Sequence, residues 1–156
     1  MSLIADVTDL AGKGALMGLD PGTKTIGVAV SDGLQMTASA LETIRRRKFS
    51  QDALRLAEIT EGRAIAGVIV GLPLNMDGSE GPRAQSARAF ARNVSEKLDL
   101  PVAFWDERLS TAAAERTLLE ADTSRKRRAE VIDALAAQHI LQGALDRIAV
   151  VRRAGA

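Results

Sequence analysis

Three short apolar segments, separated by two tight turns, lie near the start of this 156-residue chain and constrain its fold more than any other feature. Residues 15–20 end in an acid before the turn 21–24, and residues 25–30 (TIGVAV) end before the turn 31–33. Residues 36–44 follow as a third candidate strand. Apolar, β-branched segments bounded by Pro, Gly, Ser and Asp are typical of strands. Because tight turns reverse the chain, we expect an antiparallel meander.

After this meander the hydrophobic pattern predicts helices alternating with strands. Residues 65–71 (IAGVIVG) are almost continuously apolar, as expected for a strand covered on both faces. Another strand is expected at 102–105. Helices are expected at 50–63, 83–98, 111–121 and 129–148. The order β-β-β-α-β-α-β-α-α predicts an α/β fold with one mixed five-stranded sheet, in which the later strands run parallel to the first and helices flank the sheet.

The length of the chain is that of one ordinary domain, which we place at residues 15–150. Residues 1–14 are expected to be a loosely ordered N-terminal tail, and residues 151–156 a C-terminal tail. No segment approaches the roughly 18 apolar residues that a membrane span requires. The first 14 residues also lack the pattern of a signal peptide. A cytoplasmic protein without membrane association is therefore expected.

Composition narrows the possible chemistry. The chain has no cysteine and one histidine, which excludes disulfides, thiolate zinc sites and cysteine nucleophiles. Carboxylates and hydroxyls must then perform any polar chemistry. The net charge of +1 argues against a strong nonspecific DNA binder, whose affinity would rest on many phosphate contacts. Two basic runs, 45–48 and 125–128, are either solvated surface or phosphate contacts.

Two acids mark the ends of predicted strands. Asp20 ends the first strand, and Glu107 lies where the strand at 102–105 gives way to a helix. An Asp at this place also suits a turn, and the residues after Glu107 also suit a helix cap. If the two strands are parallel, both acids lie at the sheet edge where ligands of α/β sheets gather.

Asp133 lies in a strongly helical segment and shares a face with small apolar residues three, four and seven positions on. An ionised carboxylate on such a face needs a cation or a hydrogen-bond donor, and a buried salt bridge to a nearby arginine is the structural alternative. Three carboxylates suit Mg²⁺ or Mn²⁺. Two ions, roughly 3.5 to 4 Å apart, would activate water and stabilise the leaving oxygen. We therefore expect Asp20, Glu107 and Asp133 to be the catalytic, metal-binding residues.

Four motifs in a specific order then connect the chain to a known family. They are 19–32 (LDPGTKTIGVAVSD), 70–78 (VGLPLNMDG), 106–111 (DERLST) and the Asp133 helix that ends in ILQG at 140–143. With these motifs the chain closely resembles the YqgF family, the Holliday junction resolvase and pre-16S rRNA nuclease group of the ribonuclease H-like superfamily. The resemblance runs from about residue 16 to residue 146 and places the catalytic acids of the family on Asp20, Glu107 and Asp133.

The resemblance implies a cytoplasmic nuclease that trims the 5′ end of precursor 16S rRNA during ribosome biogenesis, with ribosomal particles as further partners. Its alternative is a Holliday junction resolvase similar to RuvC, because the same acids would cut either phosphodiester. A resolvase makes two coordinated cuts and usually needs a symmetric dimer. No apolar helix stripe in the sequence indicates a dimer face, so a monomer acting on RNA is favoured.

Basic and amide side chains near the acids are the expected nucleic-acid contacts. The run 125–128 precedes Asp133 by less than two helical turns, and the loop 72–78 is expected to line the site. The contacts that we predict are Lys24, Asn75, Arg108, Lys126, Arg127 and Arg128.

Two other classes of protein compete with a nuclease. An actin-like ATPase or kinase would use residues 20–25 as a phosphate-binding hairpin, but that fold needs a second domain and a second glycine-rich hairpin, which this sequence lacks. A non-catalytic nucleic-acid- or ribosome-binding module would keep the fold and the basic loops without needing all three acids. The presence of all three favours the nuclease.

Overall fold

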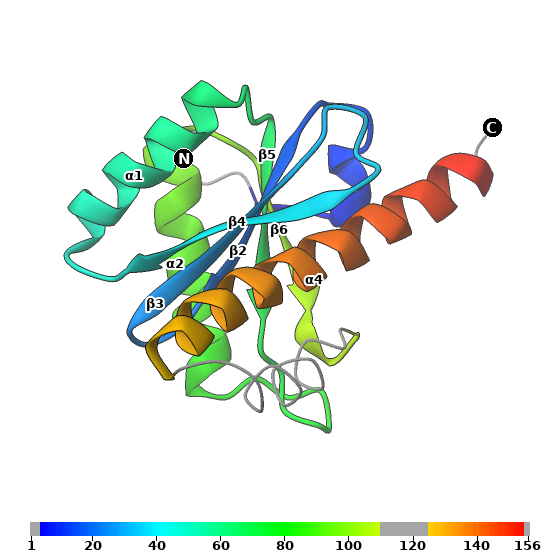
Figure 1. Cartoon of the computed structure of the whole chain (residues 1–156). Helices are drawn as coiled ribbons and strands as arrows, with labels where there is room; N and C mark the ends of the chain where they lie inside the picture. Colours follow the sequence, from blue (N-terminus) through cyan, green and yellow to red (C-terminus); the bar gives the residue numbers. More distant parts are fainter. Residues whose placement is uncertain (1–3, 110–124, 155–156) are drawn as a thin grey trace.

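The computed structural model describes residues 4–109 and 125–154. Within these ranges six strands form one sheet, in the order β1-β6-β5-β2-β3-β4 (Figure 1). The strands are β1 (Ile4–Ala5), β2 (Leu16–Pro21), β3 (Thr25–Ser31), β4 (Ala38–Arg45), β5 (Gly67–Leu72) and β6 (Val102–Asp106). The helices are α1 (Phe49–Gly62), α2 (Pro82–Leu98) and α4 (Arg125–Ala154), with two short 3₁₀ helices, η1 (Val7–Leu10) and η2 (Glu107–Leu109).

The pairing of the strands confirms the predicted mixed sheet. β2, β3 and β4 form the antiparallel meander. β5 pairs in parallel with β2, with Leu19 opposite Val70, and β6 pairs in parallel with β5, with Val70 opposite Phe104. The carboxyl ends of β2, β5 and β6 therefore lie at the same edge of the sheet, which is the condition under which Asp20 and Glu107 were expected to lie together.

The two ends of the chain differ from the loose tails that we expected. Ile4 pairs in parallel with Val102 and adds β1 as a sixth strand, while Val7 and Leu10 are buried beneath α4. Two apolar residues are too few to show a periodic pattern in the sequence, so their place in the core is recognisable only from their contacts with distant segments. At the other end α4 continues to Ala154, beyond the predicted helix end at 148. The helix expected at 111–121 lies outside the described residues.

Helices cover both faces of the sheet (Figure 1). On one face α1 and α2 pack against Met17 and Leu19, and on the other α4 packs against Leu16. This alternation follows from the strand geometry, in which successive side chains point to opposite faces. Fully buried Leu56 and Leu141 represent the two layers, and each such side chain contributes about 1.5–3 kcal/mol by leaving water. The start of α4 is thereby held over the meander.

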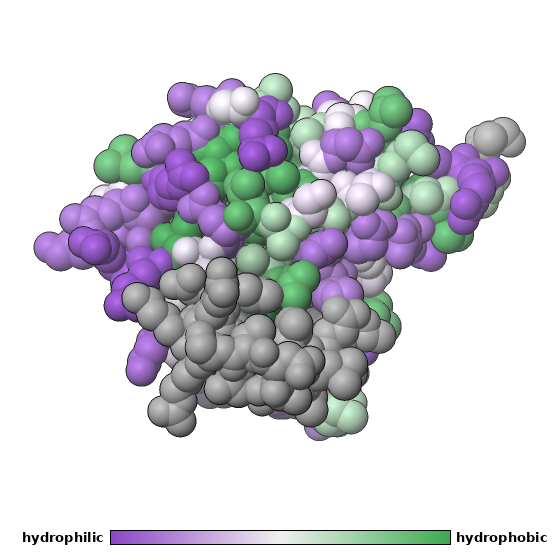
Figure 2. Space-filling view, viewed as in Figure 1, coloured by the Kyte–Doolittle hydropathy of each residue, from purple (hydrophilic) through white to green (hydrophobic). Residues whose placement is uncertain are grey.

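The molecular surface reflects this layered arrangement. Hydrophilic residues lie along α1 at the left of the view in Figure 2, and hydrophobic residues gather between α1 and α4. Across the described ranges, no helix combines the length and the apolar character that crossing a membrane would require.

Candidate active site

Asp20 stands near the end of the central strand β2, between two glycines on the neighbouring strands. Its register partner in β3 is Gly27. On the other side Leu19 pairs with Val70, so Gly71 of β5 lies beside Asp20. Residues side by side in a sheet point to the same face, and a side chain at Gly27 or Gly71 would meet residues of α4. The half-buried Asp20 side chain therefore lies on the α4 face of the sheet.

Asp133 packs directly onto Gly27. A Cβ atom added at Gly27 would lie only 1.9 Å from the Asp133 carbonyl oxygen, so α4 touches the backbone of β3 at this point. The Thr25 hydroxyl donates a hydrogen bond of 2.6 Å to Oδ2 of Asp133. The predicted need of Asp133 for a donor is thus met by a hydroxyl on β3. This bond also fixes the first described turns of α4 against the start of β3.

Glu107 occupies the matching place over Gly71. The residue opens η2 directly after β6, whose last residue, Asp106, pairs with Leu72. A Cβ atom added at Gly71 would lie 2.7 Å from Oε1 of Glu107 and 2.6 Å from Cδ1 of Ile140. The missing side chain at Gly71 therefore makes the room in which the Glu107 carboxylate lies.

The three predicted acids are thus carried to one edge of the sheet, with Asp20 in the middle and Glu107 and Asp133 packed over the glycines on either side. Their side chains do not converge further: among the residues that the structure describes, no three His, Cys, Asp or Glu side chains are placed so that they could hold one metal ion. Like charges repel, so three carboxylates that act on one ion would need that cation between them. The donor set itself is all oxygen, which suits Mg²⁺ or Mn²⁺.

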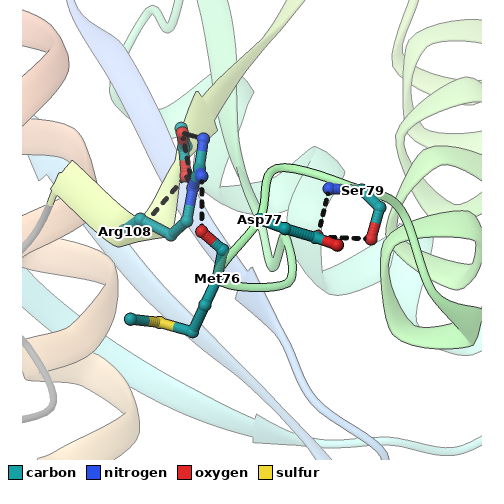
Figure 3. Close-up of polar contacts among 5 residues, drawn as sticks. Met76, Asp77, Ser79 and Arg108 are labelled. Carbon is teal, nitrogen blue, oxygen red and sulfur yellow. Dashed lines mark hydrogen bonds and ion pairs between the residues drawn. The ribbon is translucent and has the colours of Figure 1, made fainter.

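Two of the predicted nucleic-acid contacts organise the loop beside Glu107. The Arg108 guanidinium donates to the Asp106 carboxylate from Nη2 at 2.7 Å and from Nε at 3.1 Å, and its Nη1 donates to the Met76 carbonyl oxygen at 3.3 Å (Figure 3). These bonds to Arg108 lower the pKa of Asp106 below its usual value. Asn75 donates to the Ser79 hydroxyl at 3.0 Å. The loop is therefore tied to the end of β6.

The same loop is stabilised from within by Asp77. Its carboxylate accepts hydrogen bonds from the Ser79 hydroxyl at 2.6 Å and from the Ser79 N–H at 2.9 Å (Figure 3). These bonds, with the hydroxyl contributing most, lower the pKa of Asp77. Such Asp–Ser contacts favour a compact turn. The loop next to Glu107 is thus held in one conformation by its own hydrogen bonds.

The other predicted contacts lie on two further segments. Lys24 is exposed in the turn between β2 and β3. The run Lys126, Arg127 and Arg128 belongs to the first turn of α4, and the side chains of these three residues lie outside the described part of the structure.

Sequence reasoning missed the residues that support the acids. Thr25 holds Asp133, Gly27 makes room for the α4 backbone at Asp133, and Gly71 makes room for the Glu107 carboxylate. The only signal was their place inside or next to the strand motifs, because the function of each depends on strand register and on a helix far away in the chain.

Comparison with known structures defines the class of the fold. RuvC of T. thermophilus, solved in complex with a Holliday junction substrate, matches with a TM-score of 0.53 at 15% identity, over 86% of this chain and 96% of that one. A second T. thermophilus RuvC structure matches with a TM-score of 0.50 at 15% identity, over 84% and 93%. The fold is thus of the ribonuclease H-like class.

Sequence comparison gives the family. Residues 14–147 match the family described as "RuvX: Holliday junction resolvase". The chain belongs to this RuvX family, also called YqgF, which confirms the resemblance found in the motifs.

Several relatives carry one name, "Putative pre-16S rRNA nuclease". The protein of Cereibacter sphaeroides is 70% identical over 86% of this chain and 84% of its own length. That of Ruegeria sp. is 70% identical over 88% of both chains. That of Paracoccus denitrificans is 67% identical over 90% and 89%.

Proposed function

We propose that this chain is a metal-dependent phosphodiester hydrolase that processes the 5′ end of precursor 16S rRNA. The observation that carries the proposal is the row Gly71, Asp20 and Gly27 on three adjacent strands, onto which Glu107 and Asp133 pack from two other elements. Gly27 lets the α4 backbone at Asp133 approach β3, and Gly71 leaves room for the Glu107 carboxylate, so both acids come to the strand end that carries Asp20. The names of the relatives in Cereibacter, Ruegeria and Paracoccus support the choice of substrate.

The metal site of this proposal consists of Asp20, Glu107 and Asp133. Their oxygen atoms are the ligands that Mg²⁺ or Mn²⁺ prefers, and the space above Gly27 and Gly71 lets three acids share one edge. Two bound ions would supply an activated water and stabilise the leaving oxygen.

The remaining residues position the acids and the substrate. Thr25 orients Asp133 through its hydroxyl, and the Arg108 contacts hold the loop 73–81 beside Glu107. Lys24 and Asn75 are exposed around the site, and with Arg108 and the run Lys126–Arg128 they are proposed to contact the nucleic acid.

The wider setting completes the proposal. A single nuclease domain, which extends the expected residues 15–150 by β1 and η1 at one end and by the end of α4 at the other, is proposed to act as a monomer in the cytoplasm on RNA within ribosomal particles.

The test compares two substrates. Purified protein is incubated with a precursor 16S rRNA leader and with a four-way DNA junction, with and without Mn²⁺. The proposal predicts metal-dependent cleavage near the mature 5′ end of the RNA. Symmetric nicks in the junction with intact RNA would instead assign the activity named for the family, a Holliday junction resolvase. Cleavage of neither substrate, with or without Mn²⁺, would favour the non-catalytic binding module.

A further inference from the structure

A basic cleft lies on the opposite side of the β2 end from the acids. Its volume is about 590 Å³, and it is lined by the turn 21–23, by Arg46 and Arg47 after β4, and by Arg83 with its neighbours at the start of α2. In the described part of the chain, none of the residues lining this cleft is acidic. Three guanidinium groups around an open, acid-free cleft favour an anionic ligand.

The arginines of the cleft are held by the turn that follows Asp20. The Arg46 guanidinium donates to the Gly22 carbonyl oxygen at 2.6 Å and lies 5.3 Å from the centre of the Phe90 ring. The backbone N–H of Arg46 donates to the Lys24 carbonyl oxygen at 2.8 Å. Arg46 is therefore fixed as one wall of the cleft.

Arg47 and Arg83 remain available to a ligand. Both side chains are exposed, and the ion pairs found within residues 4–109 and 125–154 involve other arginines. The buried Asp52 carboxylate accepts the backbone N–H of Arg47 at 3.1 Å, which fixes the backbone of Arg47. A guanidinium group without an acidic partner is suited to bind a phosphate through two parallel hydrogen bonds.

The cleft and the acids meet at two consecutive residues of β2 that point to opposite faces of the sheet. Asp20 points to the α4 face, and Pro21, which follows it, lines the cleft. Consecutive side chains of a strand point to opposite faces, and their Cα atoms are about 3.8 Å apart. A nucleic-acid strand that crosses the end of β2 would therefore meet the acids on one side and the arginines on the other.

We propose that the cleft of Arg46, Arg47 and Arg83 binds backbone phosphates of the single-stranded RNA segment next to the bond that is cut. This inference rests on the proposed function and adds the path of the substrate strand. The run 45–48, which the sequence left open between solvated surface and phosphate contact, is thereby assigned to phosphate. The recognition is independent of base sequence, because it involves phosphates alone.

The test measures binding without cleavage. The full chain carrying Asp20→Asn is titrated against a short fluorescein-labelled single-stranded leader RNA, by anisotropy, over a series of salt concentrations. Arg47→Ala/Arg83→Ala is added to this parent. The loss of two phosphate contacts should reduce the slope of log K against log salt by about 1.4, since each contact to a single strand contributes about 0.7.

Two further variants control for folding and for charge. Arg63→Ala/Arg92→Ala removes the same charge from exposed positions outside the cleft and should keep the slope of the parent. Arg47→Lys/Arg83→Lys keeps the charge and should retain most of the slope. Melting curves establish that each variant is folded.

The outcomes separate this inference from the proposed function. Equal slopes for the cleft variant and the Arg63/Arg92 control would overturn the cleft assignment, as would RNA affinity in the parent that does not depend on salt. Cleft-dependent binding of a four-way DNA junction but not of the RNA would overturn the choice of strand. Cleavage of the leader by the unmodified chain is measured separately, so the nuclease proposal stands or fails on its own result.

Discussion

A single methyl group placed at Gly27 should separate the acids. In Gly27→Ala the new Cβ would lie 1.9 Å from the Asp133 carbonyl oxygen, whereas an ordinary contact begins near 3.4 Å. The turn of α4 that contains Asp133 must therefore move by about 1.5 Å away from β3. Overpacking of this kind costs about 1–3 kcal/mol of stability. Because a displacement of about 1 Å in a catalytic group costs on the order of 10²-fold in rate, cleavage should fall at least that far.

The assay is single-turnover cleavage of the precursor rRNA leader at a temperature well below the melting midpoint of every variant. Gly62→Ala at the end of α1 is the matched control, because a Cβ atom there meets nothing within 4 Å. This control should keep the parental rate and gain slightly in stability, since alanine is preferred to glycine in a helix. A Gly27→Ala protein that cleaves at the parental rate would refute the packing of Asp133 on β3.

Three further predictions concern the metal, the basic run and the hydroxyl. Millimolar Mg²⁺ or Mn²⁺ should raise the melting temperature, because an ion that binds only the folded state stabilises it. Asp20→Asn should abolish this increase while the metal-free variant stays folded. A melting temperature of the unmodified protein that does not change with metal would contradict the proposed site. Changing Lys126, Arg127 and Arg128 to Ala should weaken RNA binding and reduce the slope of log K against log salt. An unchanged slope would show that this run is solvated surface and does not contact phosphate. Thr25→Val removes the hydroxyl and should lower the free energy of unfolding by about 1–3 kcal/mol and slow cleavage, while Thr25→Ser should retain both the stability and the rate. If Thr25→Val changes neither the melting temperature nor the cleavage rate, the hydrogen bond does not position Asp133.

The sequence predicted the parts of the fold that local patterns determine. The five strands could be recognised because β-branched segments lay between turns, and Asp20 and Glu107 could be assigned to strand ends for the same reason. Asp133 was recognisable from its apolar helix face. The parallel pairing of β5 and β6 with β2 then followed from the order of the elements.

The features that could not be predicted depend on contacts between distant residues. The hydrogen bond from Thr25 to Asp133 joins residues 108 positions apart. The glycines beside Asp20 acquire their role only from strand register, and β1 exists only through its pairing with β6. The basic cleft likewise combines three separate segments, of which only the arginine run was visible in the sequence.

The central claim is that Asp20, Glu107 and Asp133 act together on the same metal ions in cleaving precursor rRNA. The most direct measurement is the single-turnover cleavage rate of Asp20→Asn, Glu107→Gln and Asp133→Asn, each alone and in pairs, with folding checked by melting curves. The account predicts that each single change removes most of the rate and that the pairs are hardly slower, because groups acting as a unit are strongly non-additive. A folded single variant that cleaves within a few-fold of the parental rate, or losses that multiply in the pairs, would contradict it.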